Sequence, residues 1–157
     1  MKGLDNSLYL ILYIISNVIA LILLFAAWKA PKLARLLFFL LFAWASYKNM
    51  TVAIRSPQSY LDYADFTFLD MYKQFISGWF SKHIATVIAL IATCQALIAI
   101  SMLLKNFFFK IGAVGAIVFL IAIAPLGVGA AFPCTVIMAI ALIVILSKQS
   151  TDNYGFI

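Results

Sequence analysis

Few side chains in this sequence could do chemistry, and Lys48 stands out among them. It lies near the far end of an apolar run, about 21 Å along a helix that would begin near residue 34. A charge that falls short of the far edge of a bilayer usually has a partner or a purpose. Lys48 could extend its stem to the headgroups, bind a carboxylate, or contact the polar head of a quinone or lipid. The carboxylate candidates follow it in the chain: Asp62, Asp65 and Asp70.

Gln95 is the second candidate, because its neutral amide stands near the middle of the apolar run 84–104. An amide at this depth can hydrogen-bond to a neighbouring helix, which contributes about 0.6–2 kcal/mol, or it can bind a quinone carbonyl. Aromatic side chains between Lys48 and Gln95 fit either an interfacial belt or a ligand groove: Tyr60, Tyr63, Tyr72 and Trp79. The ligand-binding hypothesis therefore names four residues: Lys48, Gln95, Tyr72 and Trp79.

The sequence predicts neither a catalytic residue nor a metal site. His83 is the only histidine, and Cys94 and Cys134 stand far apart in apolar segments, so a zinc or haem site built from His and Cys is not expected. There is also no phosphate-binding loop, catalytic triad or pair of glutamates. These absences argue against a hydrolase or kinase and favour a non-catalytic role.

The amino-acid composition indicates whether these candidate residues lie in a water-soluble protein or in a membrane protein. Hydrophobic residues make up 66% of the 157 residues and charged residues only 10%, whereas a soluble domain is about half apolar and about a quarter charged. So few charges cannot cover a water-exposed surface. The composition therefore excludes a soluble enzyme, a nucleic-acid-binding module and a disordered chain. It predicts an integral membrane protein whose first partner is the lipid bilayer.

Apolar segments long enough to cross a bilayer follow one another along the chain. The uncharged stretch 111–146 is too long for one span, and its central prolines and glycines (PLGVGAAFP) divide it into two. A cleaved signal peptide is the alternative for the first segment, although Asp5 and a single Lys2 make a poor start for one. The sequence thus predicts an all-α bundle of five transmembrane helices in a single domain, at residues 8–28, 34–54, 83–104, 108–126 and 130–147.

The segment between the second and third spans is too polar to cross a membrane. Apolar side chains recur there at spacings of three and four, which is typical of one helix face: Leu61, Ala64, Phe68, Tyr72, Phe75 and Trp79. We therefore expect an amphipathic interfacial helix at residues 60–80. It would lie in the membrane interface or pack as a lid on the mouth of the bundle.

Basic residues indicate the orientation. With five spans, three basic clusters fall on one side of the bilayer: Lys29, Lys32 and Arg35; Lys105 and Lys110; and Lys148. The positive-inside rule then places the N-terminus outside and the C-terminus in the cytoplasm, and we expect the bacterial inner membrane. Because small residues allow helices to pack closely in lipid, we expect the third, fourth and fifth spans to form the core and the first to be peripheral.

Three stretches resemble the DoxX-like family of integral membrane proteins. They are ARLLFFLLFAWASYKNM (34–50), CQALIAISMLLKNFFFKIGAVGAI (94–117) and PLGVGAAFPCTVIMAIALIVIL (125–146). The resemblance covers residues 34–147 and implies a four-helix unit preceded by an added N-terminal helix. Gln95 stands where family members often carry a Glu, and alanines follow it where they carry glycines.

Members of that family are described as subunits associated with thiosulfate–quinone or quinol-linked oxidoreductases, and distant relatives bind sterol-like ligands or assist membrane-protein assembly. The resemblance therefore implies a non-catalytic accessory subunit of a membrane redox complex, which binds a quinone or lipid and contacts other membrane proteins. The alternative is an assembly or scaffold subunit with no ligand of its own. The first requires an apolar pocket on which Lys48, Gln95 or Tyr72 converge, and the second requires a filled bundle and a partner interface on the first span.

Overall fold

The computed structural model describes residues 7–148, and over that range it consists of helices and short connections without a strand, which confirms the all-α prediction. The long helices are α1 (Ser7–Lys29), α2 (Pro31–Arg55), α5 (Ser81–Leu103), α6 (Asn106–Ile123) and α7 (Cys134–Lys148). Shorter helices connect α2 to α5: η1 (Pro57–Asp62), α3 (Tyr63–Phe66), α4 (Asp70–Phe75) and η2 (Ile76–Phe80). The 3-10 helix η3 (Ala124–Ala130) connects α6 to α7.

Four helical segments in the described part of the chain are long and apolar enough to cross a membrane: Ser7–Lys29, Pro31–Arg55, Asp70–Leu103 and Asn106–Ala130. The third of these includes α4, η2 and α5, and its backbone departs from helical geometry at His83 (φ −125°, ψ 18°). Helix α7 is apolar but has only 15 residues, or about 22 Å of helix. The described chain therefore has the helices of an integral membrane protein, and a count of five spans depends on the short α7.

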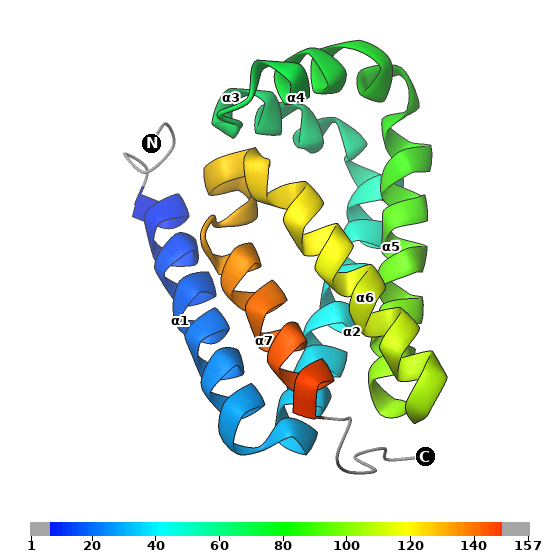
Figure 1. Cartoon of the computed structure of the whole chain (residues 1–157). Coiled ribbons are helices and arrows are strands. Elements are labelled where there is room, and N and C mark those ends of the chain that lie inside the picture. The colour runs from blue at the N-terminus through cyan, green and yellow to red at the C-terminus, as the bar shows by residue number, and fades with distance from the viewer. Residues whose placement is uncertain (1–6, 149–157) are drawn as a thin grey trace.

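The long helices run alternately up and down the bundle (Figure 1). Their contacts form a closed ring, from α1 to α2, α5, α6 and α7 and back to α1. Helix α1 begins at the end of the bundle where α3 and α4 lie, and α7 finishes at the opposite end (Figure 1). The two ends of the described chain thus lie at opposite ends of the bundle.

Helix packing differs from the expectation in two respects. Helices α2 and α5 share the most extensive contact, and α1 packs against α7, so the expectation of a core built from α5, α6 and α7 with α1 at its periphery is wrong. The inner face of α1 carries small residues, because Ala20, Ala26 and Ala27 are buried there beside Leu23. Small side chains let helices approach closely in lipid, and this stripe makes α1 part of the ring.

Residues 57–80, which we call the cap, cover one end of the bundle (Figure 1). The cap is broken into η1, α3, α4 and η2, so a single continuous helix over residues 60–80 is not what forms. The break has a tertiary cause. The hydroxyl of Thr67 donates a hydrogen bond to the carbonyl of Pro125 (2.7 Å), and the backbone N–H of Phe68 donates to the same oxygen (3.3 Å). Binding to η3 draws the chain out of the helical path between α3 and α4.

Two glycines of η3 allow the cap to sit directly on it. Gly127 has a positive φ of 64°, and a Cβ there would lie 2.5 Å from the carbonyl oxygen of Phe66. A Cβ on Gly129 would lie 2.5 Å from the ring of Tyr63. Both positions therefore require a residue without a side chain, and the glycines of the PLGVGAAFP turn serve the contact between the cap and η3.

Candidate functional site

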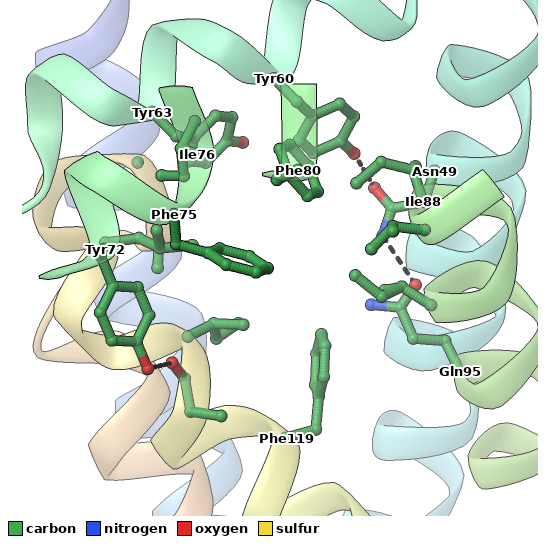
Figure 2. Close-up of a pocket in the computed structure, with 17 residues that line it drawn as sticks. Asn49, Tyr60, Tyr63, Tyr72, Phe75, Ile76, Phe80, Ile88, Gln95 and Phe119 are labelled. Atoms are coloured by element: carbon green, nitrogen blue, oxygen red, sulfur yellow. Dashed lines mark hydrogen bonds between the residues drawn. The ribbon is translucent and has the colours of Figure 1, made fainter. Parts of the chain in front are cut away.

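A cavity of about 280 Å³ lies beneath the cap, between α5 and α6 (Figure 2). We call it the amide pocket, because the side-chain amides of Asn49 and Gln95 form its polar wall. The cap, α5 and α6 supply a mostly aromatic and aliphatic lining, which includes Phe75, Ile88 and Phe119. None of the described residues that line this pocket carries a formal charge. Such a lining suits a neutral, largely apolar molecule.

The pocket exists because α5 and α6 diverge. At one end of the pair the two helices touch, since a Cβ on Gly112 would lie only 1.6 Å from the hydroxyl oxygen of Ser101. From that point α5 and α6 separate toward the cap (Figure 1). The opening between Ile88 of α5 and Phe119 of α6 is where the pocket lies. A glycine at the closed end of the pair and aromatic cap residues at the open end thus define its shape.

A directed chain of hydrogen bonds forms the polar wall (Figure 2). The hydroxyl of Tyr60 donates to Oδ1 of Asn49, and Nδ2 of Asn49 donates to Oε1 of Gln95 over 2.7 Å. Gln95 is only 4% exposed, and its side-chain nitrogen points into the cavity (Figure 2). The chain therefore ends in an N–H donor that a ligand inside the pocket can meet.

The direction of this chain depends on Tyr60 keeping its proton. Burial raises the pKa of the Tyr60 hydroxyl well above its ordinary value, and the neighbouring Tyr63 raises it further. Tyr60 is therefore neutral at physiological pH and acts as a donor. Successive donors polarise one another, so the final N–H of Gln95 favours a ligand that presents a hydrogen-bond acceptor, such as a carbonyl oxygen.

The opposite wall is aromatic. The hydroxyl of Tyr72 donates to the carbonyl of Ala122 on α6 over 2.7 Å, which ties the cap to that helix. Phe75 and Phe119 project into the cavity from the cap and from α6 (Figure 2). Phe75 is 48% exposed and Ala122 is also exposed, so this side forms the rim of the pocket rather than its floor.

The structure brings together two of the four residues in the ligand-binding hypothesis. Gln95 and Tyr72 both line the amide pocket. Lys48 is exposed on α2 and does not line it. Trp79 is also outside the lining: it is 55% exposed and stacks on the ring of His83 with 4.7 Å between centroids.

The proposed ion pairs of Lys48 are not formed among residues 7–148. Lys48 has no salt bridge there to any of the candidate carboxylates, which are all exposed: Asp62, Asp65 and Asp70. The exposed position of Lys48 agrees with a stem that extends along the surface of α2 toward the headgroups.

Sequence reasoning missed Asn49 as a site residue, and it considered Tyr60 only as part of an aromatic belt or a ligand groove. Asn49 lies on the inward face of α2, together with the buried Phe42 and Ala53 and the half-buried Ser46. The hydroxyl of Ser46 donates to the carbonyl of Ala92 on α5 (2.7 Å). The spacing 42–46–49–53 is helical, so this face was readable from the sequence. The sequence-based prediction instead chose the charged neighbour Lys48, which lies on the exposed side of α2.

The two cysteines do not share an environment. Both are unpaired thiols, and Cys94 is exposed whereas Cys134 is buried. The thiol of Cys134 donates to the carbonyl of Ser16 on α1 over 3.3 Å, which adds to the contact between α1 and α7. No group of three or more His, Cys, Asp or Glu side chains able to hold a metal ion occurs within residues 7–148.

Comparison of the chain with known protein families, with characterised proteins and with solved structures finds no match. The DoxX-like resemblance therefore remains a prediction, and the geometry of the pocket carries the functional argument.

Proposed function

We propose that this protein is a membrane-embedded binding protein for a quinone or a similar neutral lipid, which it holds in the amide pocket. The observation that carries this proposal is an uncharged, mostly apolar cavity in which the amide nitrogen of Gln95 is directed at the occupant. A quinone combines an apolar ring with carbonyl acceptors, and it meets both requirements of that lining.

The size and position of the pocket support a ligand that is only partly enclosed. Its volume of about 280 Å³ lies near the low end of the range of about 300–1,000 Å³ that is typical of small-molecule sites. A ring-sized head fits such a space, whereas a long isoprenoid or acyl tail does not. The exposed rim at Phe75 and Ala122 gives the tail a way out between α5 and α6.

We further propose that the protein is a non-catalytic, DoxX-like accessory subunit of a quinone-linked membrane redox complex. The amide pocket has no charged, thiol or imidazole group in its described lining, so its side chains position a ligand and do not transform it. The alternative scaffold function, without a ligand, requires a filled bundle, and the cavity argues against it.

The proposed topology has five spans, with the cap outside and the C-terminus in the cytoplasm of a bacterial inner membrane. Support comes from the arrangement of charges. The cap carries three aspartates and one lysine, Lys73, whereas five lysines lie near the helix ends at the opposite end of the bundle: Lys29, Lys32, Lys105, Lys110 and Lys148. The positive-inside rule assigns the lysine-rich end to the cytoplasm.

Filling the pocket tests the proposed function. We expect protein purified gently from its native membrane to retain quinone or neutral lipid detectable by mass spectrometry. Ala122→Phe places a ring at the rim of the pocket, and we expect it to lower the bound ligand per protein at least about fivefold. Ile121→Phe is the matched control, because Ile121 is 54% exposed and lies outside the lining. Equal ligand content in the two variants would contradict the proposal.

A further inference from the structure

A second cavity, of about 350 Å³, lies on the other side of the cap, where α1 meets η1, α3 and η3. We call it the tyrosine pocket, because its lining includes Tyr9, Tyr13, Tyr60 and Tyr63. Phe66 adds a fifth ring. Of the described residues that line it, only Asp62 carries a formal charge, and that charge is negative.

Contacts between the rings hold the aromatic wall of this pocket in place. Tyr60 and Tyr63 stack on one another, with centroids 5.3 Å apart and planes at 15°. Tyr9 of α1 meets Phe66 of α3 edge to face, at 5.5 Å and 65°. The wall therefore joins α1 to the cap.

The two cap tyrosines of this wall, Tyr60 and Tyr63, are neutral rings and not phenolates. Burial raises the pKa of Tyr63, and the neighbouring Tyr9 and Asp62 raise it further. A neutral aromatic face carries a negative electrostatic potential, which attracts cations. Asp62 adds a full negative charge at the same pocket.

We propose that the tyrosine pocket binds a small organic ammonium group, of the kind carried by choline or ethanolamine. Several aromatic rings and one carboxylate satisfy such a cation, because its methyl or methylene groups contact rings while its charge faces the carboxylate. An inorganic divalent cation fits less well, since it needs about six or more oxygen ligands and the lining supplies one carboxylate. An anion would be repelled by Asp62.

This site is separate from the amide pocket, although the two are neighbours. Tyr60, Tyr63 and Gly129 line both cavities and form the partition between them. Tyr9, Tyr13 and Asp62 line only the tyrosine pocket, so variants at these positions test the new site without altering the lining around Gln95.

The test compares a cation with its neutral shape analogue. Saturation-transfer NMR and equilibrium dialysis on the full chain in detergent would measure binding of choline and of 3,3-dimethyl-1-butanol, in which carbon replaces the ammonium nitrogen. We expect saturable binding of choline and at least tenfold weaker binding of the alcohol. Equal binding of both compounds, or no saturable binding of choline, would overturn the proposal.

Two pairs of variants locate the site. Asp62→Asn removes the charge and Tyr9→Leu removes a ring, and we expect each to weaken choline binding at least about threefold. Asp65→Asn and Tyr9→Phe are the matched controls and should keep wild-type affinity, because Asp65 is outside the lining and phenylalanine keeps the ring. Wild-type affinity in both Asp62→Asn and Tyr9→Leu would also overturn the assignment.

The ammonium group has two sources, a lipid headgroup or a free cation, and lipid composition distinguishes them. The same choline titration would be run in nanodiscs of phosphatidylcholine and in nanodiscs of a neutral galactolipid. Weaker apparent choline affinity in phosphatidylcholine identifies the headgroup as the occupant, through competition. Equal affinity in the two lipids identifies a free cation.

Discussion

Gly112→Ala is expected to destabilise the bundle by about 1–3 kcal/mol, as over-packing of a closely packed contact does. The added Cβ would lie 1.6 Å from the hydroxyl oxygen and 2.3 Å from the Cβ of Ser101. A rotation of the serine side chain moves the hydroxyl but not its Cβ, so α5 and α6 must move apart. The measurement is the midpoint of thermal unfolding in detergent.

Gly115→Ala is the matched control for this prediction. Gly115 lies one turn further along the same helix, and a Cβ there meets nothing within 4 Å. Alanine is also a better helix former than glycine. We expect the midpoint of Gly115→Ala to equal or exceed that of the wild type. A Gly112→Ala protein as stable as Gly115→Ala would show that α5 and α6 do not cross closely at Ser101.

Arg35→Met is expected to destabilise the bundle by about 2–4 kcal/mol, because it removes charged hydrogen bonds inside the protein. Arg35 is completely buried. Its Nε donates to the carbonyl of Met102 over 2.9 Å, and Nη2 donates to the carbonyl of Leu104. The guanidinium also lies 4.0 Å from the centre of the Phe109 ring. Arg35 thus satisfies carbonyls at the C-terminal end of α5, where a helix favours a positive charge.

Two further variants sharpen the Arg35 prediction. Arg35→Lys should restore little stability, since an ammonium cannot present the planar fork of donors that meets both carbonyls. Lys32→Met removes an exposed charge less than one turn away and should leave the unfolding midpoint unchanged. A midpoint for Arg35→Met equal to that of Lys32→Met would refute the capping role.

The long helices were predictable because their cause is local. An uninterrupted apolar run in lipid must satisfy its own backbone hydrogen bonds, so it forms a helix wherever it occurs. The expected first span at 8–28 corresponds to α1, at Ser7–Lys29, and the prolines and glycines after Ile123 separate α6 from α7 as the sequence indicates.

Features that depend on contacts between distant segments were not predictable in the same way. The cap breaks at Thr67 because Pro125, 58 residues away in the chain, accepts its hydrogen bond. In the sequence, Arg35 looks like one of the basic residues that mark the cytoplasmic side of a membrane protein. Its hydrogen bonds to carbonyls at the end of α5 become visible only in the fold. The ligand-binding hypothesis was partly predictable. Gln95 lines the pocket, as expected of an amide in the middle of a span. Lys48 is exposed instead, and its neighbour Asn49 lines the pocket.

The affinity of a short-chain quinone for the wild type and for Gln95→Met tests the central claim most directly. Ubiquinone-1, titrated into the purified protein, should bind saturably to the wild type and about three- to tenfold more weakly to Gln95→Met, because one hydrogen bond to its carbonyl is lost. Thr93→Val is the control: Thr93 is exposed on the same helix, its hydroxyl donates to the carbonyl of Ala89 one turn earlier in that helix (2.9 Å), and the substitution should leave the affinity unchanged. Wild-type affinity in Gln95→Met would contradict a ligand held by this amide.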